Sequence, residues 1–435
     1  MRFARKLFLA AILTWTAAVG AVPDSQPGLD APELARLGAY AVGVRTITLV
    51  DRVNPDVPAA DPKPGEANEG RSIAVDIWYP ARAQPKARPE TYSASMPAEP
   101  PGSPVAFTVE GIAVRGAAAV PGRRPLVIVS HGYHNATAAM IWLTENLASK
   151  GYVVAAIRHE DGESMLTPTF PHVLLRRPLD IVFVAAQLQS SLAAEGIVDP
   201  DRAALVGYSM GGFGVLTAGG ATLDPTGGAM KYVPEGVLRT YGRGGAKREV
   251  LRVHGLRGIV AISPAGGGAL SAWGSEGLAA IAAPLLLIAG DRDRTVDYGT
   301  GARTFFQEAV GAPRYLLTYK NGGHNLGLGS PPEAMRKTLW DLDWFEDPVW
   351  RKDRMIGINL HVITAFLDLY VKGDATRAAY LDGLVPDSEA GVWPEAKPGR
   401  WDAISDGKDG VTVWRGFPRR HAVGLQLRHL GVGER

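Results

Sequence analysis

The stretch Leu205-Val206-Gly207-Tyr208-Ser209-Met210-Gly211-Gly212 decides how this chain is interpreted. It is an apolar run followed by the pattern G-x-S-x-G and a glycine-rich segment that can enter a helix. In a nucleophile elbow, a serine sits on a tight turn between a strand and a helix, where its side chain is exposed and its backbone is strained. Gly207 and Gly211 suit the turn, because a Cβ would clash where the backbone folds back. A small-residue turn with a purely structural role has the same pattern, so other residues must decide.

The composition is that of a soluble globular protein with a large core. The 435 residues are 46% hydrophobic and 21% charged, and the net charge is +2. This charge gives no electrostatic case for a nucleic-acid partner. The chain has no cysteine, which excludes disulfides, thiolate catalysis and cysteine metal sites.

The N-terminus predicts export. Arg2, Arg5 and Lys6 precede a largely apolar run over residues 7–19, and Val19-Gly20-Ala21 offers small residues for cleavage. We therefore expect a signal peptide over residues 1–21 and a secreted or periplasmic protein. A retained anchor is the alternative, although the run is shorter than the ~20 residues that span a bilayer. No later stretch is apolar enough, so we expect no integral membrane segment after cleavage.

Apolar runs alternate with helical spacing along most of the chain. Strands are expected at residues 44–50, 73–79, 126–129, 152–157, 203–208, 258–262, 284–289 and 314–319, and helices at 179–192 and 355–370. Residues 51–70 and 81–104 are expected to be surface loops. The alternation predicts one α/β domain over residues 22–435, with a mainly parallel twisted sheet flanked by helices and a core over 40–375.

Two segments lie outside this alternation. Residues 221–252 follow the G-x-S-x-G helix and form either a cap over the site or a solvated surface excursion. Residues 376–435 form a C-terminal extension. Its tryptophans, Trp393, Trp401 and Trp414, suggest that it packs on the core.

A serine nucleophile needs a histidine base and a carboxylate that orients the base. The run 285–289 leads into Gly290-Asp291-Arg292-Asp293, at the strand end where α/β folds place ligands. We expect Asp293 to be the acid, with Asp291 and Asp297 as the competing candidates. His324 follows the next expected strand and two glycines, and is the predicted base.

Acyl transfer also needs donors for the tetrahedral oxyanion. The predicted donors are the backbone N–H groups of Met210, directly after the serine, and Tyr133, in the loop after strand 126–129. The Tyr133 ring and His134 are expected to line the substrate site. Trp273 either lines the pocket or packs in the core.

The remaining polar residues near these strand ends are expected to orient the site. His131 is expected to orient the loop rather than act as a base, and His159-Glu160-Asp161 to line the site or fix a loop. Asp180 is expected near a helix N-terminus, in a structural role. His131, His134 and His159 are not expected to hold a metal, and the chemistry requires no cofactor.

Several stretches together resemble the α/β-hydrolase superfamily. They are Asp76-Ile77-Trp78-Tyr79-Pro80, Ser130-His131-Gly132-Tyr133, Arg177-Pro178-Leu179-Asp180, Gly207-Tyr208-Ser209-Met210-Gly211-Gly212, Gly290-Asp291-Arg292-Asp293, Gly323-His324 and the segment 366–374. The order Ser209, Asp293, His324 is that of this superfamily. More closely, the chain resembles its secreted branch of platelet-activating factor acetylhydrolases, dienelactone-hydrolase-like predicted esterases and cutinase-like polyester hydrolases.

The resemblance implies a serine carboxylic ester hydrolase that acts on a small-molecule, lipid or polyester ester through an acyl-enzyme. True dienelactone hydrolases use a cysteine nucleophile, so here that name would describe the fold only. An acyltransferase or peptidase on the same triad is the alternative. A non-catalytic binding protein on this fold would usually lack a triad residue, and none is missing.

Overall fold

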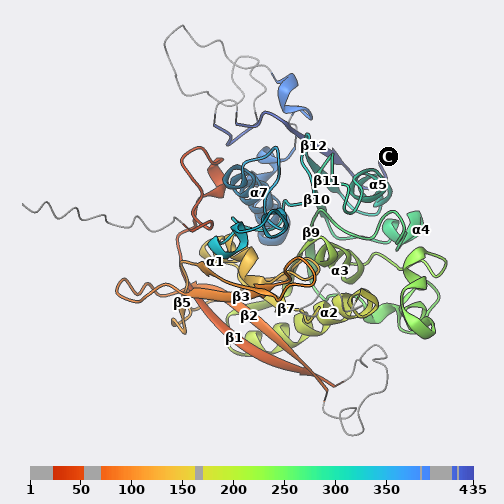
Figure 1. Cartoon of the computed structure of the whole chain (residues 1–435), viewed down its shortest axis with the longest axis horizontal. Coiled ribbons are helices and arrows are strands. Elements are labelled where there is room, and N and C mark those ends of the chain that lie inside the picture. Colours follow the sequence, from red (N-terminus) through yellow and green to blue (C-terminus); the bar gives the residue numbers. More distant parts are fainter. Residues whose placement is uncertain (1–22, 53–69, 162–169, 383–384, 392–413, 419–420) are drawn as a thin grey trace, which may run out of the picture.

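The computed structural model describes residues 23–52, 70–161, 170–382, 385–391, 414–418 and 421–435. A ten-stranded sheet crosses the molecule in the order β12-β11-β10-β9-β8-β6-β7-β2-β1-β5 (Figure 1). Its strands are β1 Ala41–Asp51, β2 Arg71–Ala81, β5 Val114–Arg115, β6 Arg124–Ser130, β7 Val153–Arg158, β8 Val198–Tyr208, β9 Leu256–Ile262, β10 Leu285–Gly290, β11 Arg314–Tyr319 and β12 Leu425–Leu430. The central strands from β7 to β11 are parallel, while β2 and β12 pair antiparallel with β7 and β11.

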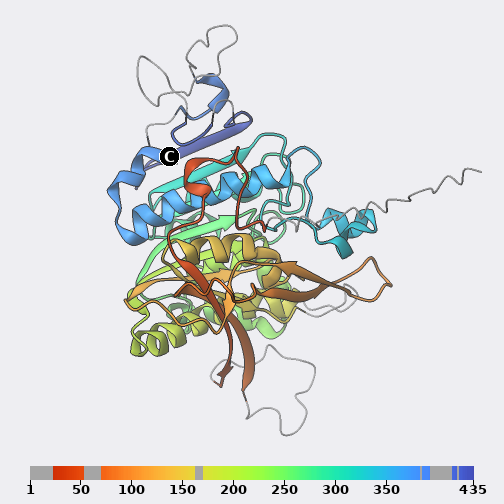
Figure 2. The same ribbon diagram turned by 90° about the vertical axis from the view of Figure 1, so that its left-hand side faces the viewer.

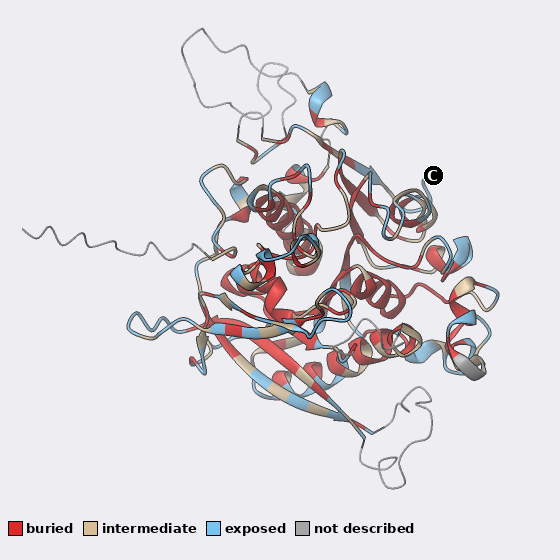
Figure 3. Cartoon of the chain, viewed as in Figure 1, coloured by how far each residue is buried: buried red, intermediate tan, exposed pale blue. Residues whose placement is uncertain are grey.

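Helices cover both faces of this sheet (Figure 2). They are α1 Ile141–Ser149, α2 Phe170–Ala194, α3 Met210–Ala218, α4 Gly274–Ala279, α5 Thr304–Glu308, α6 Leu339–Asp343 and α7 Lys352–Leu367. Helices α2 to α5 share one apolar cluster with the sheet, and α1 and α7 share the other. Along β6, Leu126 and Ile128 enter the first cluster and Val127 the second. Burial on both faces explains the continuous apolar runs of the central strands (Figure 3).

The predicted α/β-hydrolase architecture is confirmed, but some elements differ. Residues 81–104 were expected to be a loop, yet Thr91–Met96 forms β3, which pairs with β4, Val105–Glu110, in a separate hairpin. Helix α2 begins at Phe170, so Asp180 lies inside the helix and the expected position near its N-terminus is wrong. Pro178, which directly precedes the expected helix 179–192, is an interior residue of α2.

The C-terminal extension contributes to the sheet. Strand β12 pairs along the edge of β11, and Trp414 is buried. The indole N–H of Trp414 donates to the Val385 carbonyl at 2.7 Å. The other two tryptophans named above, and the expected signal peptide, lie outside the described residues.

The segment 221–252 contains the short helical turns Gly228–Lys231, Pro234–Tyr241 and Arg248–Val250. Leu223, Met230, Leu238 and Tyr241 are buried in the cluster of α2 and α3. The described part of the segment therefore packs on the core and is more than a solvated excursion.

One helical stretch among the described residues, Lys352–Lys372, is long and apolar enough to cross a membrane. Its mean hydropathy is 1.3, and 83% of the apolar window is buried inside the protein. This stretch begins with α7, which packs against the central sheet as a core helix.

Candidate active site

Ser209 lies at a sharp turn between β8 and α3. Its φ is +54° and its ψ −115°, a conformation that costs a non-glycine residue free energy. A Cβ on Gly207 would lie 2.2 Å from the Gly211 carbonyl oxygen, and a Cβ on Gly211 would lie 1.9 Å from the Ser130 oxygen. The two glycines are therefore required for the turn to close against the end of β6.

Three aspartates follow β10, and the structure gives each a different partner. Asp293 is 3% exposed, and its Oδ2 accepts a hydrogen bond from His324 Nδ1 at 2.8 Å. Asp291 Oδ1 instead accepts from the Asn321 amide, and Asp297 Oδ1 accepts from the Thr300 amide. Only Asp293 of these three meets the histidine.

Asp293 is itself fixed by its own loop. Its Oδ1 accepts from the backbone N–H groups of Thr295 at 2.9 Å and Val296 at 3.2 Å. These two bonds leave Oδ2 to face His324. The carboxylate is thus held in one orientation before any substrate arrives.

His324 links the acid to the serine. Its Nε2 lies 3.0 Å from Ser209 Oγ, while Nδ1 lies 2.8 Å from Asp293. With Nδ1–H donating to the carboxylate, Nε2 is free to accept the serine proton. The imidazole also packs on Tyr208, with ring centroids 5.4 Å apart.

The loop that carries His324 is fastened from several elements. The Gly323 amide donates to Asp347 Oδ2 at 2.7 Å, and Lys352 Nζ donates to the Asn325 carbonyl at 2.7 Å. Asn359 in α7 donates to the Leu326 carbonyl at 2.8 Å. Burial lowers the pKa of Lys352 to about 8. The three hydrogen bonds hold the loop in place, and the imidazole projects from it.

The two predicted oxyanion donors lie on adjacent strand ends. Ser130 pairs with Gly207 in the β6–β8 register, so Tyr133 and Met210 each follow neighbouring strand ends by a few residues. Met210 is the first residue of α3, where an N–H has no acceptor within the helix. This arrangement is compatible with the predicted pair of donors, which stays a prediction.

The residues predicted to bind substrate lie in different environments. Tyr133 is partly buried, and the centroid of its ring lies 3.9 Å from the ring centroid of His134 and 5.9 Å from that of Phe170. His134 is 4% exposed and borders a cavity of about 520 Å³, which residues 93–97, 104, 131, 134–137 and 158–161 line. Their contact with substrate stays a prediction.

Trp273 is 2% exposed and packs between Phe213 and Phe305. Its indole N–H donates to Thr217 Oγ1 at 3.1 Å. Trp273 also lines a cavity of about 350 Å³ beside residues 266–268, so its contact with substrate stays a prediction.

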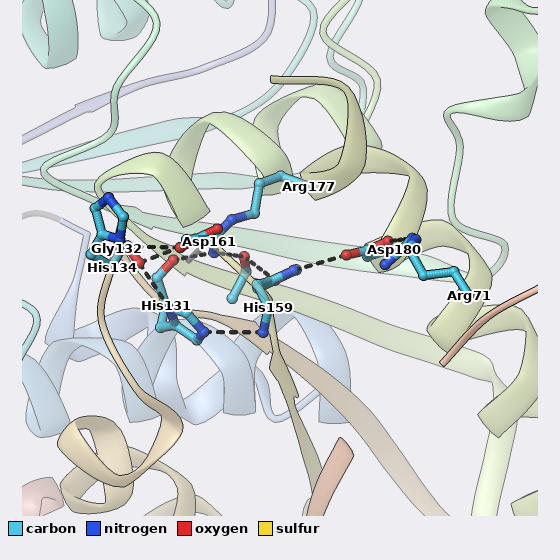
Figure 4. Close-up of polar contacts among 9 residues, drawn as sticks. Arg71, His131, Gly132, His134, His159, Asp161, Arg177 and Asp180 are labelled. Carbon is cyan, nitrogen blue, oxygen red and sulfur yellow. Dashed lines mark hydrogen bonds and ion pairs between the residues drawn. The ribbon is translucent and has the colours of Figure 1, made fainter. Parts of the chain in front are cut away.

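Sequence reasoning missed the role of a buried polar network beside this site (Figure 4). Arg177 in α2 binds the loop after β6 and pairs with Asp161, which also accepts from the His134 amide at 2.9 Å. Asp161 thus fixes a loop, one of the two roles expected for it. Arg177 was named above only as part of a resembling stretch, and no local pattern indicates its role, because its partners lie 16 to 47 positions away.

Among the residues that the structure describes, no group of three or more His, Asp or Glu side chains is arranged to hold a metal ion. The three histidines considered above have other partners. His131 and His159 hydrogen-bond within the network, and the ring of His134 packs on that of Tyr133.

The sheet topology and the sharp turn at Ser209 are those of the α/β-hydrolase fold. Residues 115–225 match the family model of PETase, described as PET hydrolase-like, and this segment includes β6, β7, β8 and Ser209. This segment of the chain is thus similar to that family, and the match supports a carboxylic ester hydrolase on the α/β-hydrolase fold.

One similar solved structure is a ferulic acid esterase from Streptomyces cinnamoneus. It is 20% identical, with a TM-score of 0.49, and the match covers 77% of this chain and 91% of that chain. No curated protein matched this chain.

Proposed function

We propose that the protein is a serine carboxylic ester hydrolase with the triad Ser209, His324 and Asp293. The observation that carries this proposal is the continuous hydrogen-bonded chain from the buried Asp293 through His324 to Ser209. The strained turn holds the serine hydroxyl at the head of that chain. A structural turn needs neither the base nor the acid at these distances.

In the proposed reaction, Ser209 Oγ attacks the ester carbonyl and its proton moves to His324 Nε2. Asp293 stabilises the imidazolium that forms. The negative charge on the former carbonyl oxygen is stabilised by the amides of Tyr133 and Met210. The tetrahedral intermediate then collapses to the acyl-enzyme, and His324 protonates the departing alkoxide.

Deacylation repeats these steps with water. His324 takes a proton from the water while the water oxygen attacks the acyl carbonyl. The second tetrahedral intermediate then breaks its bond to Ser209 Oγ and releases the acid. The proton on His324 returns to Ser209 Oγ, which restores the enzyme. No metal or cofactor is required for this sequence.

The test is the initial rate on p-nitrophenyl esters from acetate to palmitate, for wild type, Ser209→Ala and Ser263→Ala. Ser263 is a matched control, because it follows the neighbouring strand β9, has φ +42° and is buried. We expect Ser209→Ala to lose turnover and Ser263→Ala to keep it. Full activity in Ser209→Ala would overturn the proposal.

The chain-length profile then separates substrate classes. A maximum at short acyl chains supports small esters, and a maximum at long chains supports lipids, with the segment 221–252 as the candidate lid. Ser209-dependent acyl transfer to an added alcohol or amine in preference to water would instead indicate an acyltransferase.

We propose that the protein is exported and cleaved after Ala21. The support is the basic, apolar and small-residue order of residues 1–21. N-terminal sequencing of the protein expressed from the full-length gene tests this. A mature N-terminus at Val22 is expected, and an intact Met1 on the exported protein would contradict it.

A further inference from the structure

The carbonyl of Gly132 accepts an unusual number of hydrogen bonds. Arg177 Nη2 donates at 3.1 Å, the Asn135 amide at 3.2 Å, and His131 Nδ1 lies at 2.8 Å (Figure 4). A peptide group is planar and trans, so its C=O and N–H point in opposite directions. Fixing the Gly132 carbonyl therefore fixes the direction of the Tyr133 N–H.

Arg177 also holds the groups on either side of this peptide. Its Nη1 donates to the His131 carbonyl, and its Nη2 pairs with Asp161, which accepts from the His134 amide. The guanidinium is 1% exposed, and the planar fork can reach several acceptors at once. One buried cation thus orients consecutive peptides of the loop.

The ring of His131 is held in a defined tautomer. The His159 amide donates to His131 Nε2 at 3.2 Å, so Nε2 must be the unprotonated acceptor and Nδ1 must carry the hydrogen. Burial, with the charge of Arg177, holds the pKa of His131 well below its usual range. The ring is neutral, and its Nδ1–H donates to the Gly132 carbonyl.

A relay on the other side of Arg177 completes the network. His159 Nδ1 lies 3.0 Å from Asp180 Oδ2, and its Nε2 lies 2.9 Å from Ser130 Oγ. Ser130 Oγ accepts from Arg177 Nη1 at 3.2 Å. Asp180 also pairs with Arg71 at the start of β2.

This Asp180–His159–Ser130 relay has the bonding order of a catalytic triad but not its accessibility. Ser130 is 0% exposed and its hydroxyl is shared between His159 and Arg177. A substrate carbonyl cannot reach the hydroxyl, so the relay is not a second catalytic centre. Its remaining use is to hold Arg177.

We propose that Arg177 is a positioning residue that aims the Tyr133 N–H at the oxyanion, with the Asp180–His159–Ser130 relay holding its guanidinium. The proposal rests on the proposed function, because it assumes that Tyr133 donates to an oxyanion. The loop begins close to the nucleophile, since the Ser130 and His131 carbonyls lie against Gly211, two residues after Ser209.

The first test compares Arg177→Lys with Arg45→Lys. Lysine keeps the charge but cannot reproduce the fork, so Arg177→Lys should lower kcat by about 100-fold, as loss of an oxyanion donor does, with KM within about twofold. Arg45 is the matched control: it lies on β1, where its Nη2 donates to Glu195 Oε2 at 2.8 Å, and it lines neither the loop nor the cavity beside His134. Its substitution should leave kcat within about twofold.

A trifluoromethyl ketone separates positioning from general damage, because its adduct with Ser209 carries an oxyanion. In Arg177→Lys its Ki should rise by the same factor as kcat/KM falls. If Arg177→Lys does not fold, Ser130→Ala provides the test: it removes the hydrogen bond that the hydroxyl accepts from the Arg177 guanidinium and should cost roughly tenfold in kcat and in Ki together.

Unchanged kcat in Arg177→Lys, or in Ser130→Ala if that is the variant that folds, would overturn the positioning role, as would a fall in kcat without a change in the ketone Ki. Absence of Ser209-dependent turnover in wild type would instead overturn the proposed function. The two failures are therefore distinguishable. Nitrogen NMR of His131 adds a readout independent of activity, with the Nδ1–H tautomer as the expected result and the Nε2–H tautomer as a contradiction.

Discussion

Replacing Asp293 by asparagine tests the triad with little change of shape. The amide oxygen can keep both hydrogen bonds from the Thr295 and Val296 amides, at 2.9 and 3.2 Å in the wild type. The amide NH₂ then faces His324 Nδ1 across the 2.8 Å gap that Oδ2 spans in the wild type. Two donors would meet, so the imidazole must move its proton to Nε2.

That tautomer cannot accept the proton of Ser209, because Nε2 is then a donor. Wrong-tautomer histidines in such triads lower kcat about 10⁴-fold, which corresponds to about 5 kcal/mol of transition-state stabilisation. Since the two amide bonds are kept, the loss in unfolding free energy should be only about 1–2 kcal/mol. Activity should thus fall far more than stability.

The assay is kcat on p-nitrophenyl acetate, with urea unfolding of the same preparations. Asp291→Asn is the matched control, because Asp291 lies on the same turn but accepts from the Asn321 amide and not from His324. It should keep kcat within about threefold. If Asp293→Asn kept a tenth of wild-type kcat, or if Asp291→Asn lost as much as Asp293→Asn, the reasoning would be refuted.

Three further substitutions test the packing at the serine turn, at Trp273 and around the buried His361. Gly211→Ala should lower the free energy of unfolding by about 3 kcal/mol or more and abolish activity, because its Cβ would lie 1.9 Å from the Ser130 oxygen. The control is Gly196→Ala, where φ is +78° and the space around the Cβ is open. It should lower the free energy of unfolding in urea by only about 1 kcal/mol. Trp273→Phe should lower stability by about 1–2 kcal/mol and leave KM unchanged, whereas a raised KM at unchanged stability would place Trp273 in the substrate pocket. Burial lowers the pKa of His361 from 6.5 to about 3, so between these pH values the folded state binds fewer protons than the unfolded state. The free energy of unfolding should therefore fall as the pH drops below 6.5, by about 3 kcal/mol from pH 7 to pH 4. In urea titrations at both pH values, His361→Gln should remove that part of the pH dependence. An equal slope in His361→Gln would refute the assignment.

The central sheet could be predicted because its strands are apolar on both sides. The run from Leu285 to Ala289 is buried throughout, and no helix period competes with it. Strand β12 was not predicted, since Leu425–Leu430 alternates with polar residues and its pairing with β11 spans about a hundred residues of sequence. Hairpin β3–β4 was missed for a similar reason, as Thr91–Met96 is half exposed.

The candidate triad was predicted because each residue follows a recognisable strand. The orienting network was not, since its contacts form only after folding. The helix was expected to start at residue 179, after Pro178, but it includes this proline. The helix begins several residues earlier, and this places Asp180 where it can reach His159. The role of Arg177 depends on carbonyl oxygens of a distant loop, which no sequence pattern encodes.

The most direct test of the central claim is the intact mass of the protein after brief mixing with p-nitrophenyl acetate and an acid quench. The account predicts a mass increase of one acetyl group, located on the peptide that contains Ser209 and absent from Ser209→Ala. Turnover without any covalent adduct on Ser209, or an equal adduct in Ser209→Ala, would contradict it.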